Sequence, residues 1–140
     1  MKGWQASDIA YCSNVHEGES CESVAHNINH FFRAVRSKRR LSSMNTGLWL
    51  SAQAAKSYSQ NKNLLCELKA TLQENNIRLQ TINGFPYGDF HQDVVKEKVY
   101  LPDWSNKERL NYTCQLADIL ASILPKSISQ GSISTLPLGY

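Results

Sequence analysis

Short apolar runs alternate with amphipathic stretches along the chain. The apolar runs are typical of buried strands, and they predict strands over residues 8–12, 46–50, 77–82 and 131–136. Between these runs, apolar side chains recur every three or four residues, which predicts helices. The resulting order, β-α-β-α-β-α-β, indicates an α/β fold with a parallel sheet and right-handed crossovers.

The helices have recognisable starting residues and apolar faces. Ser20 is a favourable N-cap for a first helix, whose apolar face is expected to hold Val24, Ile28, Phe31 and Val35. In the second crossover, Ser51 is expected to cap a short helix over 52–59. The polar stretch 60–63 then separates it from a longer helix that begins at Leu64 or Leu65.

A third helix is expected after a capping box over residues 105–108. Its apolar positions recur at spacings of three and four, and Pro125 ends the pattern. The predicted buried face contains Leu110, Thr113, Ala117, Leu120 and Leu124.

The composition fits one globular domain of 140 residues rather than a disordered chain. No segment approaches the roughly 20 apolar residues that span a bilayer, and no secretory signal is recognisable, so we expect a cytoplasmic protein without a membrane span. The four cysteines have wide, unequal spacings and form no CxxC pair. They are expected to be free thiols, with Cys66 and Cys114 in the core.

The mild net charge of +3 is concentrated in residues 33–40, which hold five Lys and Arg side chains. These residues form the end of the first predicted helix, where cations interact favourably with the negative end of the helix dipole. A solvated helix end is therefore the preferred interpretation, and no nucleic-acid partner is predicted. A role in contacting nucleic acid or another anionic surface is the alternative.

Parallel α/β folds place ligands beside the loops that follow the carboxyl ends of the strands. This rule selects polar and aromatic side chains that suit a small polyhydroxylated molecule, because amides and imidazoles bind hydroxyls and aromatic rings cover sugar C–H groups. The candidates are Asn14, His16, Trp49, Ser51, Asn83, Tyr87, Asp89, His91, Lys96, Tyr100, Trp104, Ser134, Thr135 and Tyr140.

Several of these residues also have structural interpretations. Trp49 lies within a strand and is expected to pack in the core, while His26 and His30 are expected at the helix surface. Asp89 and His91 could share a divalent ion with Glu17 or Glu19, although an Asp-x-His loop is usually only polar. The chain has no GxGxxG, P-loop, HExxH or GxSxG motif, so nucleotide, zinc-protease and nucleophile-elbow chemistry are not indicated.

Five segments together resemble the EboE-type metabolite traffic proteins. The most specific is Asn83-Gly84-Phe85-Pro86-Tyr87-Gly88-Asp89-Phe90-His91, and the others cover residues 11–16, 47–55, 95–104 and 132–140. These proteins are similar to xylose isomerase-like barrels and to sugar phosphate isomerases and epimerases. The resemblance implies a (βα)3β parallel half-barrel, in which residues 1–140 form a single partial domain matching the amino-terminal half of a TIM-like barrel.

The resemblance also implies which residues contact a substrate. Asn14, Asn83 and Tyr87 are expected to bind it, and His16 or His91 to transfer a proton or support a metal. In the longer relatives a divalent metal is held mainly by carboxylates and a His of later strands. Those later-strand ligands are not expected in this chain, and the resemblance leaves open whether the chain itself contacts a metal. The chain alone is expected to lack isomerase activity.

The predicted half-barrel and the family resemblance lead to two hypotheses about function. The first is a partial metabolite traffic protein, whose full-length relatives bind or process a small polyhydroxylated metabolite for export, in association with a membrane partner of the same pathway. The second is a non-catalytic binding or assembly module that completes its barrel by self-association, as a homo-oligomer. Edge strands left unpaired in a half-barrel favour such association.

Overall fold

Four parallel strands form one open sheet in the order β1-β2-β3-β4. The computed structural model describes residues 3, 5–88 and 96–139. The predicted α/β class and all-parallel sheet are confirmed, and every strand overlaps its predicted segment. The strands are β1 (Tyr11–Cys12), β2 (Met44–Trp49), β3 (Ile77–Asn83) and β4 (Ser132–Ser134).

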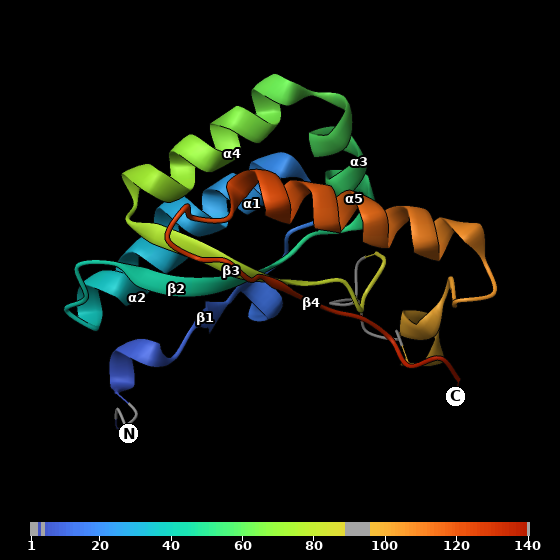
Figure 1. Cartoon of the computed structure of the whole chain (residues 1–140), viewed down its shortest axis with the longest axis horizontal. Helices are drawn as coiled ribbons and strands as arrows, with labels where there is room; N and C mark the ends of the chain where they lie inside the picture. Colours follow the sequence, from blue (N-terminus) through green and yellow to red (C-terminus); the bar gives the residue numbers. More distant parts are fainter. Residues whose placement is uncertain (1–2, 4, 89–95, 140) are drawn as a thin grey trace.

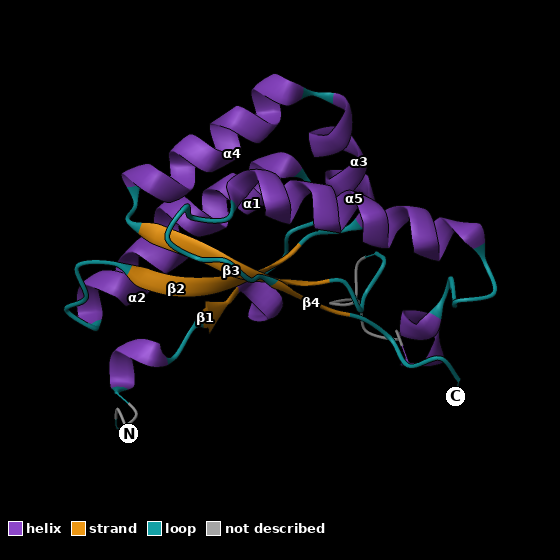
Figure 2. Cartoon of the chain, viewed as in Figure 1, coloured by secondary structure: helices purple, strands orange, loops and turns teal. Residues whose placement is uncertain are grey.

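The helices pack on one face of this sheet, where they enclose the hydrophobic core (Figures 1 and 2). Consecutive strands are neighbours and their crossovers return on the same side, so the sheet is singly wound. The α-helices are α1 (Cys21–Asn27), α2 (Arg33–Lys38), α3 (Ala52–Gln60), α4 (Lys62–Glu74) and α5 (Lys107–Ile123). Short 3-10 turns cover Ala6–Asp8, Ser13–Val15 and Lys96–Tyr100.

Side-chain caps fix where the helices begin. The Oγ atoms of Ser20 and Ser51 accept from the backbone N–H groups three residues later, as predicted. Asn61 caps α4, which therefore begins at Lys62, earlier than expected. Asn106 caps α5 by accepting from Glu108 N, so the expected capping box is replaced by a single-residue cap.

One π-helical turn, Ile28–Phe32, joins α1 to α2 and changes which aromatic residue is buried. Val24, Ile28 and Phe32 are all buried, whereas Phe31, the predicted face residue, is 42% exposed. In a regular α-helix, positions four apart drift steadily around the axis, and the wider π turn cancels this drift. The apolar stripe therefore continues through Phe32.

The pairing of β2 with β3 contains an irregularity that changes the alternation of β3. Thr46 pairs with Leu79, but the next residue, Gly47, pairs with Thr81. The extra residue, Gln80, lets both Leu79 and Ile82 face the helices, although they are three positions apart. Beyond this bulge, Thr81 and Asn83 face away from the helices.

The buried face of α5 is shifted by one position along the helix from the predicted one. The helix buries Arg109, Tyr112, Leu116, Ile119, Leu120 and Ile123, whereas Leu110 is 54% exposed. The expected core positions of Cys66 and Cys114 are also wrong, because both thiols are exposed and free. Each cysteine lies two residues from a buried position of its helix, Leu68 or Tyr112, and so faces outward.

The basic run lies at the end of α2, as predicted, but two of its arginines bind main-chain carbonyls rather than only solvent. Arg36 donates to the Leu41 carbonyl (2.9 Å). Arg39 donates to the carbonyls of Ile9 (3.0 Å) and Ala6 (2.6 Å), which attaches the segment before β1 to the end of α2.

Candidate functional site

The sheet face opposite the helices, here called the open face, carries small polar side chains. Strand register places Cys12, Gly47, Thr81 and Ser132 in one row across all four strands. A second row, nearer the carboxyl ends of the strands, contains Trp49, Asn83 and Ser134. Intervening positions such as Ile82 belong to the core cluster, so the two sets of side chains occupy opposite faces.

Asn83 is the centre of a hydrogen-bond network at the carboxyl end of the open face. Its Nδ2 donates to Asn14 Oδ1 (3.2 Å), and its Oδ1 accepts from Ser134 Oγ (3.0 Å). The same Oδ1 accepts from the Phe85 backbone N–H (3.0 Å), which fixes the orientation of the amide. Segments far apart in sequence, namely the turn after β1 and the ends of β3 and β4, therefore contribute one polar cluster, here called the Asn83 network.

Local backbone structure places each member of this network. Asn14 lies in the 3-10 turn that directly follows β1, so its side chain stays over the end of the sheet. The bond from Phe85 N to Asn83 Oδ1 is an Asx turn, which redirects the chain after β3. The Gly84 N–H donates to the Ser134 carbonyl (2.8 Å) and holds the ends of β3 and β4 together.

Below the network, a glycine allows two side chains to approach each other across β2. A Cβ atom on Gly47 would lie 2.8 Å from Thr81 Cγ2 and 2.9 Å from Cys12 Sγ. Without that atom, Thr81 is free to accept a hydrogen bond from Ser132, Oγ to Oγ1, at 2.9 Å. Thr81 and Ser132 were not predicted, although both precede a core-facing isoleucine and therefore alternate to the open face.

The predicted site residues separate into two places. Asn14 and Asn83 come together directly, and Ser134, another residue at a strand end, joins them. His16 lies elsewhere: its Nε2 is 2.7 Å from the Tyr11 hydroxyl, and its ring stacks on Phe31 at 4.1 Å. His26 and His30 are exposed, as predicted, and stack on each other.

Tyr87 is half-buried and belongs to an aromatic and cationic cluster beneath the loop after β3. Its ring meets Tyr112 edge to face at 5.1 Å, and the Arg109 guanidinium lies 5.7 Å from its centre. Trp49 is 1% exposed, so it is buried as predicted, but it lies on the open face outside the helix-covered core cluster and donates through Nε1 to the Pro86 carbonyl (3.0 Å). His91 and Asp89, the other residues predicted in this loop, lie outside the described residues.

Arg109 is the residue in this region that the sequence pattern did not reveal. It is fully buried, and its guanidinium donates to three carbonyls: Pro102 (2.8 Å), Gly84 (2.8 Å) and Phe85 (3.1 Å). Burial lowers the pKa of this guanidinium from its ordinary value, and an arginine side chain keeps its charge near neutral pH. Arg109 thus connects the start of α5 to the turn that carries Asn83.

No family model, curated protein or solved structure matches this chain. The arrangement of its own residues must therefore indicate the chemistry. Over the described ranges, no group of three or more His, Cys, Asp or Glu side chains is placed to hold a metal ion. Over the same ranges, no helix combines the length and apolar character required to cross a membrane.

The Asn83 network can bind and orient a ligand through neutral hydrogen bonds. Amides and hydroxyls both donate and accept, which matches the hydroxyl groups of a polyol. Asn14 and Ser134 are exposed and Asn83 is half-exposed, so a small molecule can reach them. Asn14, Asn83 and Ser134 are not titratable near neutral pH, so they have the chemistry to hold a hydroxylated ligand in place but not to transfer protons.

Alkaline pH is expected to destabilise the protein through Tyr112. Its hydroxyl donates to the carbonyls of Leu50 and Pro86, and burial raises the pKa of the phenol above its ordinary value of 10.0, while the charge of Arg109 opposes this rise. Above about pH 10 the unfolded chain loses this proton while the folded chain keeps it, so stability is constant below that pH and falls above it.

The substitution Tyr112→Phe isolates this effect. At pH 7 it should cost about 1–2 kcal/mol, because the Leu50 and Pro86 carbonyls lose a donor. The difference between the two proteins should shrink above pH 10, where only the wild type pays the ionisation penalty at this position. Urea unfolding at pH 7, 9 and about 11 measures this, and a constant difference across that series would contradict the assignment.

Proposed function

We propose that this chain is part of a xylose isomerase-like barrel of the EboE type and that its open face binds a small polyhydroxylated metabolite. The observation that carries the proposal is the Asn83 network, which gathers side chains from the ends of β1, β3 and β4. Ligand sites of parallel α/β barrels are built at this end of the strands.

The winding of the sheet supports the barrel part of the proposal. Sequential strand order with all crossovers on one side is the pattern of a barrel wall, whereas doubly wound sheets place helices on both faces. In a closed barrel, the open face would become the interior. The polar rows around Gly47 and Asn83 would then line an enclosed site rather than a surface.

Substitution of Asn83 tests the binding site. Xylose, xylulose and xylitol are titrated separately into 15N-labelled protein, and the expected chemical shift changes centre on residues 14, 83–85 and 134. Asn83→Ala should weaken binding about three- to tenfold, the loss expected for one or two neutral hydrogen bonds. Asn63→Ala removes an exposed asparagine from α4 and should leave binding unchanged.

The titration can also contradict the proposal. If none of the three compounds shifts these resonances, or if the shifts centre on the helix-covered side, the open face is not the metabolite site. Because Asn83 shapes the turn after β3, thermal unfolding of N83A is measured in parallel. Reduced binding counts only if the variant remains folded at the titration temperature.

A specific observation favours the second candidate, a module that closes its barrel by self-association. Among the described residues, most of the large apolar side chains that are exposed lie near one of the two edge strands of the sheet, β1 or β4. Ile9 and Val15 flank β1, and Phe31 stacks on His16 just after that strand. Leu101 and Leu138 line one pocket with Leu136, which follows β4. Light scattering discriminates the two candidates, since barrel closure between copies requires a discrete oligomer.

A further inference from the structure

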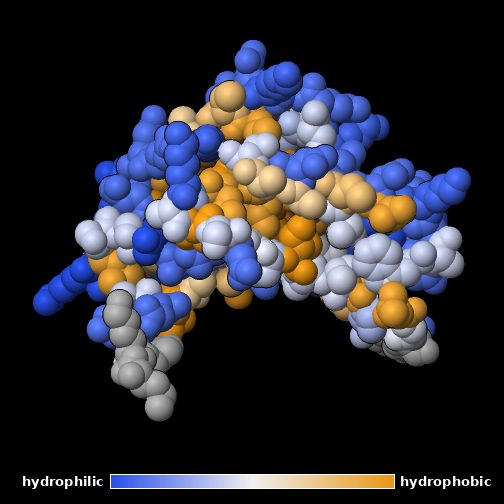
Figure 3. All heavy atoms as spheres, in the orientation of Figure 1, coloured by the Kyte–Doolittle hydropathy of each residue, from blue (hydrophilic) through white to orange (hydrophobic). Residues whose placement is uncertain are grey.

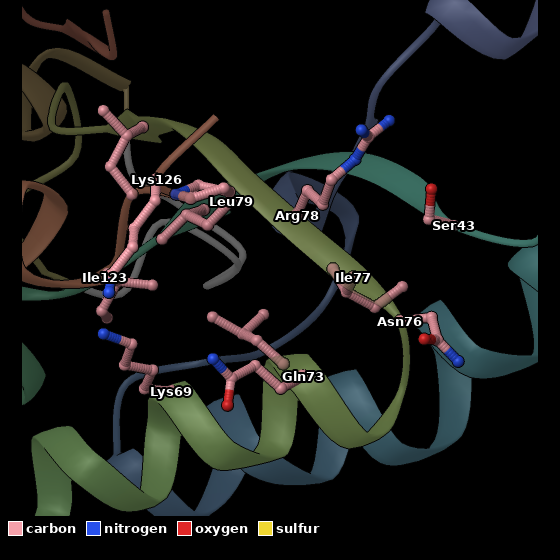
Figure 4. A pocket seen from close by; sticks show the side chains of 12 residues that line it. Ser43, Lys69, Gln73, Asn76, Ile77, Arg78, Leu79, Ile123 and Lys126 are labelled. Carbon is pink, nitrogen blue, oxygen red and sulfur yellow. The ribbon is translucent and has the colours of Figure 1, made fainter. Parts of the chain in front are cut away.

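A second cleft lies on the helix-covered side of the sheet, between the carboxyl ends of α4 and α5 (Figure 4). Its volume of about 400 Å³ is within the range of small-molecule sites. It borders the first residues of β3, whereas Asn83 ends that strand, so this α4–α5 cleft is separate from the Asn83 network. Its walls are formed by Ser43, Lys69, Leu72, Gln73, Asn76, Ile77, Arg78, Leu79, Ile123, Leu124, Pro125 and Lys126.

The floor of the cleft is apolar and firmly held. Leu72 of α4, Ile77 and Leu79 of β3 and Ile123 of α5 are all members of the core cluster, and none is more than 6% exposed. In Figure 3, apolar atoms reach the surface in a hollow between α4 and α5, with hydrophilic side chains around it. A ligand seated here would meet a preformed apolar surface.

The rim of the cleft is cationic. Lys69 and Gln73 point into it from α4, and Lys126 enters from the segment after α5, while Arg78 points away across the strand (Figure 4). No Asp or Glu is present among the described residues that line the cleft. The Lys69 ammonium has one long contact, 3.4 Å to the Ser122 carbonyl in the last turn of α5.

We propose that the α4–α5 cleft binds a single-chain organic acid. The carboxylate would be held by Lys69 and Lys126 from opposite walls, with the Gln73 amide as a further donor, and the apolar body would cover Leu79 and Ile123. The charge of the rim selects an anion, and the floor selects a hydrocarbon body over a sugar, because it offers hydroxyl groups no hydrogen-bond partner.

Decanoate is the probe, kept below its micelle concentration and titrated into 15N-labelled protein. We expect shift changes in the backbone resonances of residues 69–79 and 122–126, and weaker binding as salt is raised. Two matched compounds separate the contributions of head and tail: decanol lacks the charge, and acetate lacks the chain. Both should bind at least about tenfold more weakly than decanoate if head and tail each contribute.

The double variant Lys69→Gln/Lys126→Gln should lower decanoate affinity about tenfold, as expected for the loss of two partly exposed charged contacts. Lys62→Gln removes one positive charge from the same helix outside the cleft and should bind decanoate like the wild type. These side chains lie at the rim, so the variants should fold, which circular dichroism melting verifies.

Three results would overturn the proposal. The first is that decanol binds as well as decanoate, the second is that the double variant retains wild-type affinity, and the third is that decanoate leaves the cleft resonances unmoved. The last result, together with a lowered melting temperature for Lys69→Gln, would show that Lys69 only neutralises the final carbonyls of α5. The Asn83→Ala variant should bind decanoate normally, so this test is independent of the metabolite proposal.

Discussion

Replacing Arg109 with methionine should destabilise the protein by about 3–5 kcal/mol, more than any other single change considered for this chain. Methionine fills part of the same apolar space but cannot donate a hydrogen bond. The carbonyls of Gly84, Phe85 and Pro102 would then lose the donor that the buried guanidinium supplies. Because these partners are main-chain atoms, no compensating substitution can remove them.

This cost differs from that of a buried ion pair. Replacing both members of such a pair by apolar residues is often neutral or stabilising. Here only the cation can be replaced, and its contacts with the Tyr87 and Tyr112 rings are lost as well. Arg109→Lys keeps the charge but lacks the planar fork that reaches several carbonyls, so it should fall between wild type and Arg109→Met.

Urea unfolding followed by tryptophan fluorescence measures the effect. Arg33→Met is the matched control: it makes the same change at an exposed helical position and should alter stability by no more than about 0.5 kcal/mol. In Arg109→Met, the resonances of residues 83–85 should also move, since Arg109 holds the turn after β3. Unchanged stability in Arg109→Met would show that the guanidinium does not support this turn.

Gly47→Val should cost about 1–3 kcal/mol and disturb the open face. A Cβ atom at this position would lie 2.8 Å from Thr81 Cγ2 and 2.9 Å from Cys12 Sγ, closer than such atoms approach in folded proteins. Thr81 would have to rotate, and its hydrogen bond with Ser132 would break. Two strands therefore respond to a substitution in a third.

A rescue experiment identifies the clash as the cause. Gly47→Ala should cost less than Gly47→Val, and adding Thr81→Ser should recover part of that loss. Serine lacks the clashing Cγ2 but keeps the hydroxyl that bonds Ser132. Thermal unfolding of the single and double variants measures the coupling between the two positions. Purely additive effects would locate the cost of Gly47→Ala in the contact with Cys12 or in the backbone instead.

The strands and their order could be predicted from the sequence because short apolar runs between helical patterns leave few alternatives. The helix faces were harder. In α5 two stripes have the same 3-4-3-4 spacing, one beginning at Leu110 and one at Arg109. The presence of arginine favoured the wrong stripe, although Tyr112, Leu116 and Ile119 are the bulkier residues. A buried arginine that binds only carbonyls has no acidic partner in the sequence to reveal it.

The misassigned face of the first helix and the unforeseen open-face position of Thr81 in β3 have a common cause. Periodicity assumes a constant number of residues per turn or per pleat, whereas the π turn at Ile28–Phe32 and the bulge at Gln80 each accommodate one extra residue. Both irregularities are fixed by tertiary packing. The sequence therefore placed Asn14 and Asn83 in one predicted site, but it did not reveal the Thr81–Ser132 pair beside them.

The neutrality of Asn14, Asn83 and Ser134 has a consequence for selectivity. These groups recognise hydroxyls by direction and spacing, and they supply no positive charge to balance a phosphate. A free sugar and its phosphate ester would therefore gain the same energy from the Asn83 network. Any preference between the two would have to come from residues that contact the far end of the molecule, so the hydroxyl pattern and the phosphate would be recognised separately.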